Sequence, residues 1–192
     1  DKDSFLFSKV NEVGYDWIFD IFEDREGNLW FASMGSGVWK HNPQANSFEK
    51  YINKEGEPNS LSSNSVSSVM QDSKGRIWLS TDGGGICRYN AETNDFTSFS
   101  IKEGLPDDVA YEILEDDAHN LWFGTNKGLV KFNPETKDIH VFTTKDGLLG
   151  NQFNYKSALK VGDGRFFFGG INGLIAFDPN ISRQQLAPPS PI

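Results

Sequence analysis

Apolar and polar positions alternate over short stretches of this chain, and Gly, Asn, Asp and Pro cluster between the stretches. A period of two residues between turn signals is typical of half-buried β-strands. Nowhere do apolar residues keep a 3.6-residue period over several turns, so we expect almost no helix. The pattern therefore predicts an all-β chain of many short strands.

One phrase of alternating residues occurs four times. The copies span residues 23–33, 71–81, 115–125 and 160–170, of which the last is the least regular. Each copy places a large aromatic anchor just after a turn, at Trp30, Trp78, Trp122 and Phe167. Successive anchors are 48, 44 and 45 residues apart in the sequence numbering. Self-similarity at such a period is the signature of a repeat protein.

Each repeat contains up to four candidate strands. An apolar stretch precedes the anchor strand, and a second alternating stretch follows it after a glycine. Three copies add a last strand, at 47–51, 95–99 and 138–142. Four strands per unit and a period in the forties are typical of β-propeller blades, which stack face to face. We expect a β-propeller of about four four-stranded blades, with approximate limits 16–51, 64–99, 108–142 and 153–178.

The two ends of the chain do not form whole repeats. The last copy stops after its third strand, near Phe177, whereas residues 3–8 resemble an extra outer strand with no blade before it. If residues 3–8 pair with the last copy, they close a four-blade ring without a free edge. The alternative is a slice of a larger propeller, whose exposed blade faces would self-associate. Propeller repeats fill residues 1–181, and the Pro-rich residues 182–192 are expected to be a linker.

The repeated residues have structural explanations. The anchor tryptophan is a wedge of large apolar area between neighbouring blades. The Asp of the Asp-x-x-Gly step begins a tight turn, and Gly takes its position of positive φ. His119 stands at that Gly position in the third copy, so we expect a slightly different or strained turn there.

Composition supports the β assignment and excludes several functions. Aromatic residues make up 14% of the chain, and there are 19 glycines. The net charge of −9 argues against nucleic-acid and anionic-membrane binding. No apolar run is long enough for a membrane helix, so we expect no direct membrane insertion. The single cysteine, Cys87, excludes an internal disulfide and is expected to be buried and inert.

Catalytic and metal sites are not supported by the sequence. The recurrent acids Asp24, Asp72 and Asp116 lie in equivalent turns of separate blades, too far apart to work as the carboxylate pair of a glycosidase. The three histidines fall at different points of the repeat and match no ligand motif. We therefore expect no catalytic residues, no metal and no cofactor.

A ligand site is expected at one mouth of the central axis. Propeller ligands tend to contact loops that enter the innermost strands and loops that join the second and third strands. Aromatic faces and planar polar groups suit sugars, although the aromatic residues could equally be strand residues that pack the channel wall. The candidate ligand-binding residues are Tyr15, Trp17, Asn64, Asp82, Asp108, Tyr111, Asn126, Asn154, Tyr155 and Asn172.

The repeat resembles a known family. The pattern Val-x-x-Ile-x-Glu-Asp-x-x-Gly-x-Leu-Trp-x-Gly-Thr-x-x-Gly-Leu is similar to the two-component regulator propeller repeat. The linkers 102–106 and 145–148 fit that family, and so do 150–154 together with 168–174. The resemblance covers roughly residues 3 to 181. It identifies the family through four linked copies, although it does not specify a ligand.

The resemblance implies a sensor. Such propellers form the periplasmic part of hybrid two-component proteins, in which an immunoglobulin-like domain, a membrane helix, a histidine kinase and a receiver usually follow. Family members typically sense oligosaccharides released from glycans. More blades than four are usual in the family, which favours the slice interpretation.

The leading hypothesis is therefore a non-catalytic, periplasmic sensor fragment, part of an inner-membrane protein, that binds a glycan-derived oligosaccharide. Its partners would be that oligosaccharide and either a second copy of the chain or remaining propeller blades. One alternative is a stand-alone protein-interaction propeller. The other is a polysaccharide-active hydrolase or lyase.

Overall fold

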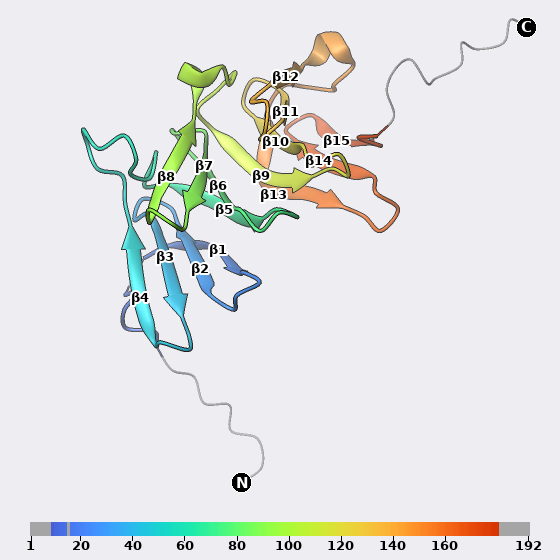
Figure 1. Cartoon of the computed structure of the whole chain (residues 1–192). Helices are drawn as coiled ribbons and strands as arrows, with labels where there is room; N and C mark the ends of the chain where they lie inside the picture. The colour runs from blue at the N-terminus through green and yellow to red at the C-terminus, as the bar shows by residue number, and fades with distance from the viewer. Residues whose placement is uncertain (1–8, 15, 181–192) are drawn as a thin grey trace, which may run out of the picture.

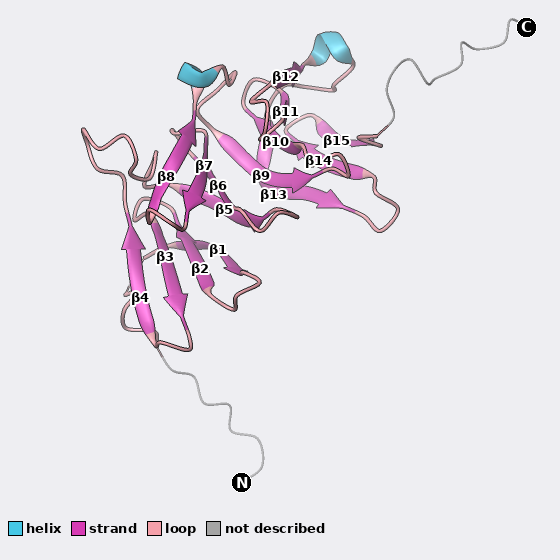
Figure 2. Ribbon diagram, viewed as in Figure 1, coloured by secondary structure: helices cyan, strands magenta, loops and turns pink. Residues whose placement is uncertain are grey.

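The computed structural model describes residues 9–14 and 16–180, which form fifteen strands in four antiparallel sheets. Three sheets have four strands and the last has three (Figures 1 and 2). The first two sheets comprise β1 (Ile18–Glu23), β2 (Leu29–Ser33), β3 (Val38–Asn42), β4 (Ser47–Tyr51), β5 (Val66–Gln71), β6 (Ile77–Thr81), β7 (Ile86–Asn90) and β8 (Asp95–Phe99). The other two comprise β9 (Ala110–Glu115), β10 (Leu121–Thr125), β11 (Leu129–Phe132), β12 (Ile139–Phe142), β13 (Phe153–Lys160), β14 (Phe166–Gly170) and β15 (Gly173–Phe177).

The sheets are arranged as the blades of a β-propeller, as predicted. Within each blade, successive strands pair in sequence order, so each blade is a meander. The first strands, β1, β5, β9 and β13, lie toward the centre, and the later strands extend outward (Figure 1). Helix is confined to two single turns of 3₁₀ helix in the described part of the chain, at Ile101–Glu103 and Thr144–Asp146.

Apolar clusters between adjacent blades form the core. Trp30 packs on the second blade together with Leu79 and Phe96, and Trp78 packs on the third blade with Phe123 and Phe132. A third cluster joins Trp122 to the three-stranded sheet. Burying a large aromatic side chain between two sheets contributes on the order of 2–3 kcal/mol from its area alone. The tryptophans are therefore the wedges that the sequence predicts.

The turn aspartates hold these tryptophans as well as their own turns. The carboxylate of Asp116 accepts the Trp122 indole N–H at 2.8 Å and the backbone N–H groups of Ala118 and Asn120. The same indole–carboxylate bond joins Trp30 to Asp24 and Trp78 to Asp72. A buried indole N–H needs such an acceptor, so each aspartate ties the turn to the core.

In the third copy of the turn, His119 occupies the position of positive φ that glycine takes in the other copies. His119 adopts φ +62°, where the equivalent Gly27 and Gly75 adopt +80° and +84°. The turn itself is unchanged, because the backbone N–H of His119 still donates to the Asp116 carbonyl at 3.0 Å. A non-glycine residue in this region carries the strain that the sequence predicts.

Cys87 is fully buried in the first inter-blade cluster, where burial raises the pKa of its thiol. This agrees with the expected inert cysteine.

In the part of the chain that the structure describes, both terminal blades carry exposed apolar side chains. Ile21 on β1 is 64% exposed, and Leu159 on β13 and Leu174 on β15 are 59% and 61% exposed. In Figure 1 the blade of β1–β4 and the blade of β13–β15 lie at opposite ends of the arrangement. The proposed closing strand at 3–8 and the proposed linker at 182–192 lie outside the described residues.

Candidate functional site

The inner strands begin, and the second strands end, at the same mouth of the propeller axis, because these strands are antiparallel neighbours in every blade. This geometry brings Tyr111, near the start of β9, and Tyr155, near the start of β13, to one mouth with the residues that follow β6 and β10. The pairing of first and second strands is irregular at this end, as between Phe153 and Ala158. Bulges of this kind re-aim side chains beside functional sites.

Five side chains from four blades meet at this mouth. The Tyr155 hydroxyl donates to Asp82 Oδ2 at 2.7 Å, and the Tyr111 hydroxyl donates to Asn126 Oδ1 at 2.7 Å. The two tyrosine rings are edge to face with centroids 4.8 Å apart, and the Phe19 ring lies 5.4 Å from Tyr155. We call these five residues the axial cluster.

Trp17 extends the axial cluster toward solvent. Its ring centroid lies 6.4 Å from that of Phe19, and its side chain is 70% exposed. An exposed tryptophan face next to partly buried aromatic rings provides a flat apolar surface on which a ligand can stack.

The environment of the axial cluster is acidic. Burial raises the pKa of Tyr155, and the Asp82 carboxylate that accepts its hydrogen bond raises it further. Burial likewise raises the pKa of Tyr111, with added effect from the negative charges of Asp82 and Asp107. Both phenols therefore stay protonated at neutral pH and act as hydrogen-bond donors.

A charged group lies farther along the same inner strands. Lys156 on β13 places its Nζ 2.7 Å from Asp20 on β1 and 4.0 Å from Glu112 on β9. Asp20 also accepts the backbone N–H of Val69 on β5, at 2.9 Å. These contacts join inner strands of all four blades. Burial raises the pKa of Glu112, against the opposing effect of the Lys156 charge.

Two predicted ligand residues instead hold loops between blades. The side chain of Asn64 accepts the backbone N–H of Asn53 at 2.7 Å. Asp108 accepts the backbone N–H of Ile101 at 2.8 Å. In each case the residue's carbonyl also accepts two glycine N–H groups of the preceding blade. Their repeated position therefore serves the propeller itself.

The remaining predicted residues are spread over the mouth or lie outside it. Asn172 donates to the Leu149 carbonyl at 3.3 Å, within the loops of the fourth blade. Asn154 is exposed on β13. Tyr15 lies outside the described residues. The structure thus brings together Asp82, Tyr111, Asn126 and Tyr155, with Trp17 at their margin.

Sequence reasoning missed Phe19, Asp107 and Lys156. Phe19 looks like an ordinary strand residue, and Asp107 like a turn residue next to Asp108. Lys156 carries one signal, since it is a charged residue in a predicted inner strand. The Lys156 backbone adopts φ +50°, a conformation that no sequence pattern predicts for this residue.

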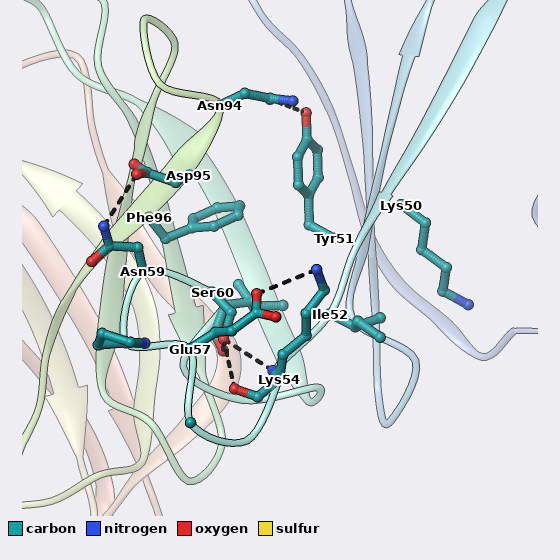
Figure 3. A pocket seen from close by; sticks show the side chains of 13 residues that line it. Lys50, Tyr51, Ile52, Lys54, Glu57, Asn59, Ser60, Asn94, Asp95 and Phe96 are labelled. Atoms are coloured by element: carbon teal, nitrogen blue, oxygen red, sulfur yellow. Dashed lines mark hydrogen bonds and ion pairs between the residues drawn. The ribbon is translucent and has the colours of Figure 1, made fainter.

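A second hollow lies at the outer rim, between β4 and β8 (Figure 3). We call it the rim hollow. Its volume is about 410 Å³, and its walls include Tyr51, Lys54, Asn59 and Phe96. Its polar walls are largely bonded to each other: Lys54 to Glu57 at 3.3 Å, Asn59 to Asp95 at 3.3 Å, and Tyr51 to Asn94 at 2.7 Å.

Neither site is arranged for a metal. Among the described residues, no group of three or more His, Cys, Asp or Glu side chains could hold a metal ion. In the same part of the chain, none of the helices has the length and hydropathy to cross a bilayer.

Comparison with known proteins places these features in a family. Residues 13–35, 60–83 and 104–127 match the family model described as Two component regulator propeller. A stretch of 71 residues is 31% identical to Histidine kinase P4 of Formosa agariphila and covers 37% of this chain but 5% of that kinase.

Solved structures agree with the sequence matches. The extracellular domain of the hybrid two component system BT3049 from B. thetaiotaomicron superposes with a TM-score of 0.76 at 30% identity, over 85% of this chain and 22% of that one. Virginiamycin B lyase from Staphylococcus aureus shares the fold alone, with a TM-score of 0.65 at 13% identity, over 91% of this chain and 59% of the lyase. This chain therefore spans a small part of its two-component relatives.

The blades and their axial mouth define a β-propeller module similar to the extracellular domain of a hybrid two component system. The chain carries two-component regulator propeller repeats, which confirms the resemblance inferred from its sequence. Its relatives include the extracellular domain of a hybrid two component system and a histidine kinase.

Proposed function

We propose that this chain is a non-catalytic sensor module that binds a neutral, glycan-derived oligosaccharide at the axial cluster. One observation carries the proposal: Tyr111, Tyr155 and Phe19 converge from different blades beside the polar groups of Asp82 and Asn126. Aromatic faces and fixed hydrogen-bonding groups together match the apolar faces and hydroxyls of a sugar.

The charge at the mouth selects among sugars. The negative charges of Asp82 and Asp107 both raise the pKa of Tyr111, and Lys127 Nζ lies 3.4 Å from the Asp107 carboxylate. A uronic or sulfated sugar would meet these carboxylates and lose binding energy to like-charge repulsion. Neutral sugars escape this penalty, so they are the expected ligand class.

We further propose a periplasmic location, in a parent protein that crosses the inner membrane and carries a histidine kinase beyond this chain. The likeness to extracellular domains of hybrid two-component systems and to a histidine kinase supports this placement. Because the axial cluster joins residues of all four blades, a bound sugar would favour one packing of the blades over another. Signalling is then a population shift toward the liganded packing.

A thermal-shift screen tests the proposal. Neutral oligosaccharides of two to eight units, uronic-acid oligosaccharides and sulfated oligosaccharides are each added in millimolar amounts. A ligand at ten times its Kd adds about 1.4 kcal/mol of stability, which raises the midpoint by a few degrees. We expect this rise only with neutral sugars.

Variants locate the effect. Trp17→Ala and Tyr155→Phe should abolish or weaken the rise, whereas Leu159→Ala, at an exposed residue near the other end of β13, should preserve it. If no sugar moves the midpoint at high concentration, the sugar-sensing proposal fails. Release of shorter products from a polysaccharide would instead support a lyase or hydrolase.

A protein-binding propeller is the second candidate. Trp17, Leu149 and Ile171 are 70%, 59% and 59% exposed, as an apolar protein-docking surface would be. This candidate predicts that Trp17→Ala leaves every sugar response unchanged.

A further inference from the structure

The inner strand of the fourth blade departs from regular pairing more than the other inner strands do. In this blade, β13 runs from Phe153 to Ala158 while its partner β14 covers only Phe168 to Gly170. In each of the other blades, the first strand gains a single residue over the second strand at this place. We call residues 154–157, the extra part of β13, the wide bulge. Bulges bend a strand and re-aim the side chains that they carry.

The backbone of the wide bulge includes an unfavourable conformation. Lys156 adopts φ +50°, and within residues 9–14 and 16–180 it is the one non-glycine residue of positive φ that lies inside a strand. The other non-glycine residues of positive φ lie in turns: Asn46, Asn94, His119 and Lys137. The left-handed conformation costs energy in any residue with a Cβ atom, so it persists where surrounding contacts hold it in place.

The second strand leaves room for the wide bulge. A Cβ atom on Gly169 would collide with the Ser157 hydroxyl, and a Cβ atom on Gly170 would collide with the carbonyl oxygen of Gln152. Glycine at both positions therefore lets the bulge lie directly against β14. The bulge is thus built from both strands of the pair.

The Lys156 side chain supplies the contacts that hold this backbone. Its Nζ lies 2.7 Å from Asp20 Oδ2 on β1 and 4.0 Å from Glu112 Oε1 on β9. Asp20 is itself fixed, because it accepts the backbone N–H of Val69 on β5 at 2.9 Å. The Asp20 side chain is 13% exposed, so solvent and salt screen this ion pair less than a pair on the open surface.

Two adjacent residues of the wide bulge contact two adjacent residues of the first blade. Lys156 binds Asp20, and the ring of Tyr155 lies edge to face with that of Phe19. The Tyr155 hydroxyl reaches the second blade as well, where it donates to Asp82 at 2.7 Å. The conformation at Lys156 therefore sets the direction in which the preceding Tyr155 leaves the strand.

We propose that Lys156 is a positioning residue of the axial cluster. Its ion pair with Asp20 holds the left-handed backbone of the wide bulge, and this backbone aims the Tyr155 hydroxyl at Asp82. Loss of the ion pair lets the bulge relax toward an ordinary strand, so that Tyr155 leaves Asp82. Lys156 acts on the sugar through Tyr155, and this part of the inference rests on the proposed function.

The Tyr155 resonance in ¹⁹F NMR of fluorotyrosine-labelled protein tests the positioning role without any sugar. Tyr155→Phe assigns the resonance by its disappearance. Lys156→Met keeps the length of the side chain but removes its charge, and Asp20→Asn removes the partner charge. Each variant should move the Tyr155 resonance, and the double variant should move it no farther, because all three lose the same contact. Lys156→Arg keeps the charge and should leave the resonance near its wild-type position.

Lys160→Met is the matched control. Lys160 lies on the same strand, its side chain is 36% exposed against 35% for Lys156, and its Nζ is also 2.7 Å from a carboxylate, that of Asp117. It stands outside the wide bulge, so its loss should leave the Tyr155 resonance unchanged.

Sugar binding gives a second measurement. A preformed site binds more tightly than one that must be ordered by its ligand. The Kd of the neutral sugar with the largest thermal shift should therefore rise about fivefold or more in Lys156→Met, and stay within about twofold of wild type in Lys156→Arg and Lys160→Met.

Two results would overturn the positioning role: a Tyr155 resonance that stays in place in both Lys156→Met and Asp20→Asn, or one that moves as far in Lys160→Met. If Lys156→Met does not fold, as a collapse of the Tyr51 and Tyr89 resonances would show, Asp20→Asn decides the matter. If no sugar binds wild type, the proposed function fails, while the Tyr155 resonance still decides whether Lys156 positions Tyr155.

Discussion

At the scale of single residues, the turn aspartate has two roles, of which the sequence predicted one. It stabilises its own turn, and it also accepts the indole N–H of the anchor tryptophan. The Asp-x-x-Gly spacing predicted the turn correctly, including the positive φ at His119. It did not predict that the second carboxylate oxygen accepts the indole N–H of the anchor six residues later. That bond needs the tryptophan rotamer, which inter-blade packing sets. The fourth copy has Val161 and Phe167 at these positions, so acceptor and donor are absent together.

Asp116→Ala tests this double role. The substitution leaves the Trp122 indole N–H and two turn N–H groups without their acceptor in a buried site. Unsatisfied buried donors cost about 1–3 kcal/mol each, so the free energy of unfolding should fall by roughly 2–4 kcal/mol. Urea unfolding measures the loss. Asp163→Ala, at an exposed turn aspartate with no tryptophan partner, should change it by no more than about 0.5 kcal/mol.

The pKa of Glu112 predicts a pH effect on stability. Because burial raises the pKa of this carboxyl above its ordinary value of 4.5, the folded state holds the proton more tightly than the unfolded chain. The contribution to stability is therefore full below about pH 4.5 and is lost as the pH rises through the folded value.

Glu112→Gln removes this titration. The variant should match wild type at pH 4 and exceed it in unfolding midpoint at pH 7, as measured by thermal unfolding at both values. A variant that is less stable than wild type at pH 7 would show that the Lys156 contact outweighs the cost of burial.

At the scale of elements, the strands were predictable and their ends at the axis were not. Alternation and repetition placed the anchor strands, the strands after glycine and the outer strands. The sequence did not predict the irregular pairing at the start of each inner strand. A bulge depends on the neighbouring strand, and the local pattern of apolar residues does not show it. These starts position Tyr111 and Tyr155. Asn64 and Asp108 appeared functional from their place in the loops, yet they tie loops between blades.

The anchors should dominate the packing between blades. Trp78 is fully buried between the second and third blades, so Trp78→Ala should lower the free energy of unfolding by about 3–5 kcal/mol. Trp17→Ala removes the same side chain from an exposed site and should leave the unfolding midpoint unchanged. Chemical unfolding of the two variants side by side makes the comparison. An unaffected midpoint in Trp78→Ala would mean that the blades do not depend on this wedge.

At the scale of the whole molecule, four similar blades meet around one axis and differ where they meet. Symmetry in the sequence predicted the propeller. The axial cluster breaks that symmetry. Asp82 and Asn126 stand at the same position of the repeat, yet Asp82 accepts from Tyr155 of the fourth blade, whereas Asn126 accepts from Tyr111 of its own blade. Repetition alone could therefore indicate the mouth but not the residues that converge there. The exposed apolar residues Ile21, Leu159 and Leu174 follow from the same architecture, because each blade buries one face on each neighbouring blade among the described residues.

The central claim is that a neutral oligosaccharide binds at the axial cluster. The chain has five tyrosines, so ¹⁹F NMR of fluorotyrosine-labelled protein gives one probe at each. Tyr111 and Tyr155 report the axial cluster, while Tyr51 and Tyr89, hydrogen-bonded to Asn94 beside the rim hollow, serve as internal controls. On titration with the sugar that gives the largest thermal shift, the resonances of Tyr111 and Tyr155 should move together while Tyr51 and Tyr89 stay fixed. Movement confined to Tyr51 and Tyr89, or no movement at any tyrosine, would contradict the account.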